Sequence, residues 1–159
     1  MPLSDIRVID LTRILADMGA DVIKIEPPAG DPVREQGVVR DGVSWYFAQF
    51  NRNKKSVVLD LYTDEGKQTL ARLIEDADVL VENYRPGVLD KMGFDQARLD
   101  ALNPNLVVTS VNGYGSTGPY VDRPSFDFIA QAMSGFMSVN GADGGDPMRA
   151  APPMSDLIA

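Results

Sequence analysis

Short runs of Val, Ile and Leu recur along the chain, and polar or turn-forming segments separate them. Short runs of this kind are typical of buried strands in a parallel sheet. We expect strands at residues 6–11, 21–26, 56–61, 78–82 and 106–111.

Helical patterns lie between and after these strands. Thr63 can cap a helix through its hydroxyl group. Apolar residues then recur in this helix at helical spacing, at Leu70, Leu73, Ile74 and Ala77. Further helices are expected at residues 96–102 and 125–139. Strands that alternate with helices predict an α/β fold with a mostly parallel sheet flanked by helices.

The helix expected at residues 125–139 has a pronounced apolar side. That side carries Phe126, Ile129, Met133, Phe136 and Met137. Met and Phe at helical spacing usually pack inside a protein. We therefore assign these residues to the core rather than to a cofactor site.

The composition narrows the chemistry. The 159 residues include 44% hydrophobic and 24% charged residues, which suits a globular domain with one sizeable core. Cys and His are both absent, so we expect no disulfide, no metal site and no thiol or imidazole catalyst. Nucleophilic or acid–base chemistry would have to use carboxylates, hydroxyls or lysines.

The charge and the N-terminus bear on partners and location. A net charge of −8 argues against nucleic acid or an anionic membrane as the main partner. A phosphorylated small ligand stays open, because Arg52, Lys54 and Lys55 form a local basic cluster, although a solvated turn explains that cluster equally well. The start MPLSDIRVIDL lacks the features of a secretory signal, and no apolar run is long enough to span a membrane. We expect a cytoplasmic protein.

Residues 79–93, VLVENYRPGVLDKMG, show how polar groups can reach the rim of the sheet. An apolar run ends abruptly at Asn83, Tyr84 and Arg85, and a Pro-Gly turn follows. In open α/β folds, ligands bind at the carboxyl ends of the strands. An amide, a phenol and a guanidinium at that edge suit a ligand with a flat polar ring and phosphates.

The sequence of this segment resembles the ENFRPG segment of the family III CoA-transferases, which include formyl-CoA and carnitine CoA-transferases. The segment RPSFDFIAQAMSG, followed by GADGGDPMRAAPPMSDLIA, is similar to a second conserved region of that family. The resemblance covers essentially all 159 residues. It implies a Rossmann-like sheet that forms part of the large domain of an interlocked homodimer.

The resemblance also implies roles for individual residues. Asp156 falls on the position of the catalytic aspartate, which attacks an acyl-CoA thioester and then carries CoA as an aspartyl thioester. The implied coenzyme A contacts are Arg13, Ile14, Leu15, Leu59, Asn83, Tyr84, Arg85 and Lys91. Two positions depart from formyl-CoA transferase, since Pro27 replaces an arginine and Tyr62 replaces a lysine. These departures put the phosphate contacts in doubt, and Arg34 or Arg85 could supply such a contact instead.

The connection between the first two strands is too short for the predicted fold. Only residues 12–20 separate them, whereas a crossover between parallel strands needs roughly a dozen or more residues. Related chains carry about nine more residues between the positions of Ala16 and Asp17, by the resemblance. We therefore expect residues 1–159 to form a single, incomplete Rossmann-like domain that binds CoA, with a shortened first crossover.

The residues Gly113, Gly115 and Gly118 form the pattern GxGxxG after a predicted strand. A dinucleotide site needs a helix that begins at the last glycine. Pro119 follows instead, so we reject this interpretation.

The resulting hypothesis is a CoA-transferase that moves CoA between an acyl-CoA thioester and a small free carboxylic acid. Two alternatives remain: a racemase of 2-methylacyl-CoA thioesters from the same superfamily, and a CoA- or nucleotide-binding module without catalysis. The racemase uses a His-Asp pair where this chain has Phe126 and Asp127, which disfavours it. The motifs do not specify the acyl donor or the acceptor acid. The 159 residues alone are expected to be inactive.

Overall fold

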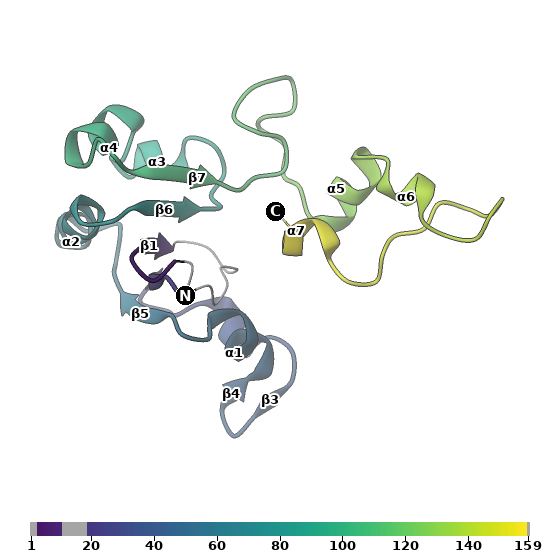
Figure 1. The fold of residues 1–159 in the computed structure, drawn as a ribbon, viewed down its shortest axis with the longest axis horizontal. Helices are drawn as coiled ribbons and strands as arrows, with labels where there is room; N and C mark the ends of the chain where they lie inside the picture. Colours follow the sequence, from purple (N-terminus) through teal and green to yellow (C-terminus); the bar gives the residue numbers. More distant parts are fainter. Residues whose placement is uncertain (1–2, 11–18, 159) are drawn as a thin grey trace. The chain divides into compact units, whose positions relative to one another are not determined.

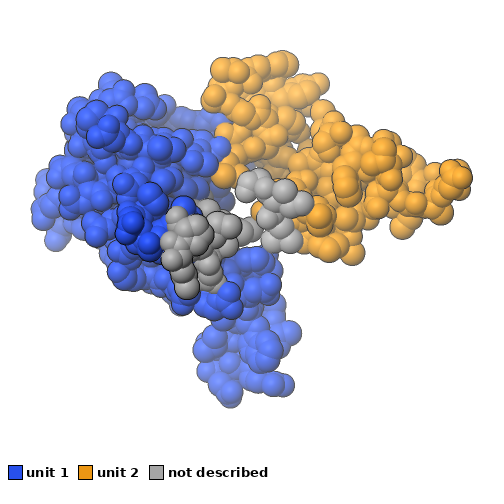
Figure 2. All heavy atoms as spheres, viewed as in Figure 1, with its two compact units in different colours: residues 1–110 blue, residues 111–159 orange. Residues whose placement is uncertain are grey.

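The computed structural model describes residues 3–10 and 19–158 of the chain. It forms two compact units, which we call unit 1 (residues 1–110) and unit 2 (residues 111–159) (Figure 2). The predicted contacts Arg13, Ile14 and Leu15 lie outside the described residues. The expectation of one incomplete domain stays a prediction.

Unit 1 is built on a five-stranded parallel sheet, as the apolar runs predict (Figure 1). The strand order is β5-β2-β1-β6-β7, and every neighbouring pair runs parallel. The strands are β1 (Arg7–Asp10), β2 (Asp21–Glu26), β5 (Lys55–Val58), β6 (Val79–Glu82) and β7 (Val107–Ser110). The strand expected at residues 56–61 ends early, because residues 59–61 leave the sheet.

The central strand β1 marks the point where the strand order reverses. It pairs with β2 on one side and with β6 on the other. The pairing with β2 is continuous from Arg7 opposite Asp21 to Asp10 opposite Lys24. The connection between these strands lies largely outside the described residues, so the shortened crossover stays a prediction. At such a reversal, a crevice opens at the carboxyl ends of the strands.

Two predicted helices pack on the sheet of unit 1. Helix α2 (Asp64–Glu75) begins where expected, since the Thr63 hydroxyl accepts a hydrogen bond of 3.1 Å from the Gly66 amide. Helix α4 spans Gln96–Leu102, as predicted. The core combines side chains of the sheet with side chains of α2, α4 and the connecting segments, and its fully buried members include Ile9, Leu70, Ile74, Leu80 and Phe94.

Several short elements have no clear periodicity in the sequence. They are the 3₁₀ helix η1 (Pro32–Glu35), the hairpin of β3 (Val39–Arg40) and β4 (Val43–Ser44), α1 (Trp45–Asn51) and α3 (Val88–Lys91). Local caps explain two of them. The Asp31 carboxylate accepts a hydrogen bond from the Val33 amide at η1, and the Ser44 hydroxyl accepts one from the Phe47 amide at α1.

Unit 2 corrects the prediction of one helix at residues 125–139. The segment forms two helices, α5 (Asp127–Met133) and α6 (Phe136–Val139). The break falls at Gly135, whose φ of 79° lies in the left-handed region that ends helices. A third short helix, α7, spans Met154–Ile158.

The core assignment for this segment is also wrong in part. The side chains of Phe126, Met133 and Phe136 are exposed, by 67%, 58% and 37%. The buried residues of α5 are instead the polar Asp127 and Gln131. Most of this segment is helical, as the spacing predicts, but the α5 face that unit 2 buries is a polar one.

Within residues 3–10 and 19–158, no helix is both long enough and apolar enough to cross a bilayer.

The core of unit 1 can be tested at Ile74, which is 0% exposed. We expect Ile74→Ala to lower the free energy of unfolding by about 2–5 kcal/mol, because it leaves a cavity between α2 and the sheet. Urea unfolding followed by circular dichroism measures this change. The control Arg72→Ala, on the exposed side of α2, should change stability by less than about 0.5 kcal/mol. Equal losses in both variants would contradict the assigned core.

Candidate functional site

A pocket of about 300 Å³ opens in unit 1 at the carboxyl ends of β2, β5 and β6. Its lining combines apolar groups, such as Ile25, Leu59 and Met92, with polar ones. This volume lies at the lower end of the range for small-molecule sites. The location agrees with the rule that ligands of open α/β sheets bind beyond the strand ends.

Three of the predicted coenzyme A contacts line this pocket together. Leu59 follows β5, and Asn83 and Tyr84 follow β6. They come from segments more than 20 residues apart in the sequence. Pro27 and Tyr62, the two positions that depart from formyl-CoA transferase, line the same pocket. The pocket therefore brings together three of the implied contacts and both of the positions that depart from formyl-CoA transferase.

Tyr84 is held firmly at the edge of this pocket. Its side chain packs against the hydrophobic core, and its amide donates a hydrogen bond of 2.7 Å to the Glu82 carboxylate. Burial raises the pKa of the Tyr84 phenol, and the nearby Glu82 and Tyr62 add to this shift. The phenol is therefore neutral at physiological pH, and its ring can offer a flat apolar face to a ligand.

Arg85 and Lys91 occupy a different position. Both side chains are exposed, and neither belongs to the pocket lining. They remain predicted contacts for a part of the ligand outside the pocket. Arg34, considered above as a phosphate partner, directs two of its guanidinium nitrogens at Glu26 instead.

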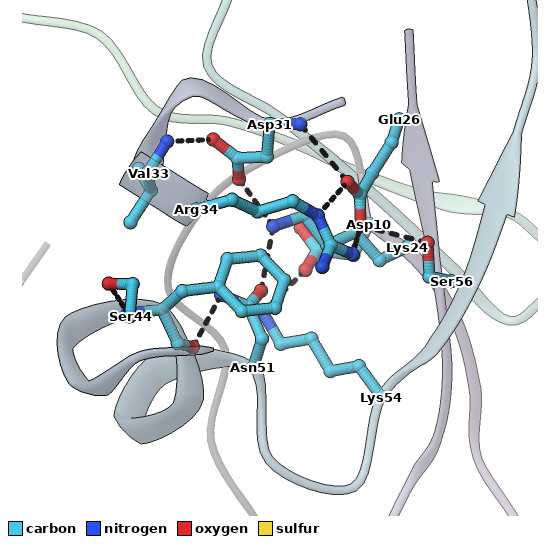
Figure 3. Close-up of polar contacts among 11 residues, drawn as sticks. Asp10, Lys24, Glu26, Asp31, Val33, Arg34, Ser44, Asn51, Lys54 and Ser56 are labelled. Atoms are coloured by element: carbon cyan, nitrogen blue, oxygen red, sulfur yellow. Dashed lines mark hydrogen bonds and ion pairs between the residues drawn. The ribbon is translucent and has the colours of Figure 1, made fainter. Parts of the chain in front are cut away.

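A buried carboxylate, Glu26, lines the pocket. It lies within a set of polar contacts that Figure 3 shows. It is 2% exposed and accepts four hydrogen bonds. Two come from Arg34, at 2.8 Å each, one from the Ser56 hydroxyl at 2.8 Å and one from the Asp31 amide at 3.0 Å. Arg34, together with Ser56 and the Asp31 amide, lowers the pKa of Glu26 to about 2 against the opposing effect of burial.

Lys24 extends this wall toward α1. Its ammonium group pairs with the Asp31 carboxylate and donates a hydrogen bond of 2.7 Å to the Asn51 side chain (Figure 3). The ring of Phe47 contacts two cations, with Lys24 Nζ at 4.7 Å and Arg34 Cζ at 4.0 Å from its centroid. This network joins β2, η1 and α1 around the pocket.

The basic cluster at residues 52–55 is only partly a solvated turn, because one of its lysines is buried. Lys54 is buried, with a side chain 2% exposed, and pairs with Asp10 at 2.7 Å. Lys55 is exposed and pairs with Asp21, whose pKa it lowers. At least Lys54 therefore has a structural partner.

The sequence analysis missed the roles of Lys24 and Glu26, although a signal was present. A strand buried on both faces should read as nearly continuous apolar residues. Charged residues inside DVIKIE indicate that buried partners must exist elsewhere in the chain. Among the described residues, no buried side-chain nitrogen or oxygen lacks a hydrogen-bond partner.

In unit 2, the glycine pattern has a packing reason at its first position. A Cβ atom on Gly113 would lie 2.0 Å from the Ser125 Cβ, so only glycine fits there. No helix begins at Gly118, and the next one, α5, begins at Asp127. A dinucleotide fingerprint needs a helix at that glycine, and the loop found there agrees with the loop expected after Gly118.

Asp156 lies in the first turn of α7, at the surface of unit 2. Partial burial raises the pKa of its carboxyl group, and the negative charge of Asp127 adds to this shift. The first effect reflects a partial loss of hydration, and the second reflects repulsion between like charges. Both make the carboxylate more basic, which favours its action as a nucleophile. Within residues 3–10 and 19–158, no three carboxylates lie close enough together to hold a metal ion.

Comparison with known proteins identifies the family of this chain. The family model described as CoA-transferase family III matches residues 3–159. The chain belongs to CoA-transferase family III. The resemblance noted in the sequence is thereby confirmed, as is the α/β fold of the family.

Named relatives of this family III chain are CoA-transferases. The succinate–glutarate CoA-transferase of Agrobacterium fabrum is 44% identical, over 99% of this chain and 44% of the relative. The human succinyl-CoA:glutarate CoA-transferase is 40% identical, over 98% of this chain and 38% of the relative. The crystal structure of a CAIB/BAIF family protein from Brucella suis is 39% identical with a TM-score of 0.89, over 98% of this chain and 45% of that one. The chain thus spans less than half the length of these relatives.

The hydrogen bonds to Glu26 predict that the stability of the fold falls at acid pH. A carboxylate with a depressed folded-state pKa stabilises the fold above its unfolded value of 4.5, and this contribution is lost as the pH falls toward about 2. The shift corresponds to about 3 kcal/mol. We expect Glu26→Gln and Arg34→Gln to be less stable than the parent at pH 7, with the difference shrinking toward pH 2.

Urea unfolding at several pH values between 7 and 2 measures this difference. Glu26→Gln should lose this pH dependence, whereas Arg34→Gln should keep part of it, because its Glu26 carboxylate still accepts from Ser56 and the Asp31 amide. A parent-like decline in stability for Glu26→Gln over this range would contradict the role assigned to its carboxylate.

Proposed function

We propose that this chain forms the CoA-binding and nucleophile-bearing part of a CoA-transferase. The enzyme moves CoA between an acyl-CoA thioester and a free carboxylic acid. The observation that carries the proposal is the pocket of unit 1, where Leu59, Asn83 and Tyr84 come together. Family membership supports the reaction class.

The pocket suits the adenine end of coenzyme A. Leu59 and the Tyr84 ring provide apolar contacts for a flat base, and the Asn83 amide can both donate and accept hydrogen bonds at its edge. The exposed Arg85 and Lys91 would meet phosphates outside the pocket. Arg13, Ile14 and Leu15 would line the path of the pantetheine arm.

Asp156 would perform the exchange. Its carboxylate attacks the thioester carbonyl, which forms a mixed anhydride and releases the CoA thiolate. The thiolate attacks the carbonyl of the aspartyl group, which releases the first carboxylic acid and leaves an aspartyl-CoA thioester. The acceptor carboxylate then attacks this thioester, and the same steps in reverse yield the new acyl-CoA and free Asp156.

The remaining parts of the assembly are also proposals. Backbone amides from a downstream glycine-rich loop, outside these 159 residues, would stabilise the oxyanions. The enzyme would act as an interlocked homodimer in the cytoplasm, and the 159 residues alone would be inactive. Relatives named for succinate and glutarate make succinyl-CoA and a dicarboxylic acid the first substrates to test.

The binding role of the pocket is tested at Asn83. We expect Asn83→Ala to weaken CoA binding about tenfold, because one hydrogen bond to the base contributes about 1 kcal/mol or slightly more. Isothermal titration of the protein at its full encoded length with CoA measures this change. The control Asn105→Ala replaces an exposed asparagine outside the pocket lining and should bind CoA as the parent does. Equal affinity of both variants and the parent would refute the contact.

The chemistry is tested at Asp156 by trapping with hydroxylamine. The protein at its full encoded length, incubated with succinyl-CoA, should form a hydroxamate at Asp156 that mass spectrometry locates. Asp156→Ala should lose about three orders of magnitude or more in acyl exchange, whereas the exposed control Asp146→Ala should keep it.

Other outcomes of this experiment distinguish the alternatives. A pure CoA-binding module would form no hydroxamate. A racemase would instead exchange the α-proton of a 2-methylacyl-CoA with deuterated water. Either result would refute the transferase.

A further inference from the structure

Two buried polar residues of α5 form a contact that the proposed reaction does not use directly. Asp127 and Gln131 are 8% and 1% exposed. They lie one helical turn apart, and Gln131 Nε2 donates a hydrogen bond of 2.6 Å to Asp127 Oδ2. Burial of two such groups is unfavourable unless all their bonds are made.

Their remaining bonds reach across to the segment that carries Asp156. Asp127 Oδ1 accepts a hydrogen bond of 2.8 Å from the Ser155 amide. Gln131 Oε1 accepts one of 2.9 Å from the Ala150 amide. The partners are 28 and 19 residues away along the chain. The two side chains thus hold both ends of the segment 150–155.

Two residues of this segment cannot donate backbone hydrogen bonds. Pro152 and Pro153 have no amide hydrogen to donate. The first amides of a helix have no partner within the helix. Asp127 supplies such a partner at Ser155, the residue directly before Asp156. The position of the Asp156 backbone therefore depends on a bond that comes from α5.

Both oxygens of Asp127 are engaged in these bonds, and so are both polar atoms of the Gln131 amide. This arrangement defines the orientation of Gln131, because a flipped amide would lose the bonds to Asp127 and Ala150. It also gives Asp127 the role of an acceptor from two donors rather than of a proton-transfer group.

We propose that Asp127 and Gln131 are positioning residues for Asp156. They fix the start of α7 so that the Asp156 carboxylate keeps one orientation toward the thioester carbonyl. This inference rests on the proposed function, since it assigns a purpose to the geometry around the nucleophile. It assigns roles to two residues that do not touch the substrate.

The hydrogen bonds that Asp127 and Gln131 accept from the Ser155 and Ala150 amides can be tested without any substrate. Hydrogen exchange monitored by nuclear magnetic resonance reports on single amides. In the parent protein, the amides of Ser155 and Ala150 should exchange at least about tenfold more slowly than that of Asp143, which lies in an exposed loop of unit 2. Equal exchange of all three amides would overturn the inference, whatever happens to the variants.

The functional consequence is tested with Asp127→Asn in the protein at its full encoded length. An asparagine side chain has one oxygen, so it can accept from Ser155 or from Gln131 but not from both. We expect kcat to fall about 10- to 100-fold, since a small misplacement of a reacting group has this effect. KM for acyl-CoA should stay within about threefold, because the CoA pocket lies in unit 1. The control Asp143→Asn should match the parent.

Three outcomes would overturn the positioning role. The first is a kcat of Asp127→Asn within twofold of the parent. The second is a loss of activity that equals the loss of folded protein measured by circular dichroism. The third is a hydroxamate at Asp156 that forms equally fast in parent and variant. By contrast, absence of any hydroxamate in the parent would refute Asp156 as the nucleophile, so the two failures are distinguishable.

Discussion

The pocket of unit 1 depends on the burial of one carboxylate, Glu26, at the end of β2. Removing a charge from water is costly, and only a full set of partners offsets this cost. The four hydrogen bonds to Glu26 come from the Asp31 amide, Arg34 and Ser56. They connect β2 with β5, with η1 and with Asp31, the residue that precedes η1. The wall of the pocket is therefore defined before any ligand arrives.

Unit 2 uses the same device around its candidate nucleophile. Asp127 is also a buried carboxylate, and its two oxygens accept from Gln131 and from the Ser155 amide. In each unit, a buried carboxylate whose two oxygens both accept hydrogen bonds fixes the backbone of a neighbouring segment. That segment belongs to the pocket lining in unit 1 and carries the exposed Asp156 in unit 2. Such networks give a single arrangement, because any alternative leaves a polar atom unpaired in a low-dielectric environment. The proposed binding pocket of unit 1 and the proposed nucleophile of unit 2 are thus each held by a network of their own.

Local patterns were reliable where one physical rule was sufficient. Each of the five expected strands forms, because short runs rich in Val and Ile between turn-forming segments favour strands of a parallel sheet. Thr63 caps α2 as its side-chain chemistry predicts. The expected helix at residues 125–139 failed because Gly135 ends it and because helical spacing does not say which face is buried. The exposed Phe126 and buried Gln131 show this most directly.

The sequence by itself determined the α/β class, the parallel sheet and, through its motifs, the family. It also named Leu59, Asn83 and Tyr84, which the structure then brought to one pocket. Tertiary structure alone decided the partners of the buried charges. Lys54 pairs with Asp10 across 44 residues, and Asp127 reaches Ser155 across 28. The physical reason is that periodicity reports what each element buries, whereas the pairing of distant polar groups depends on how the strands and helices are ordered in space.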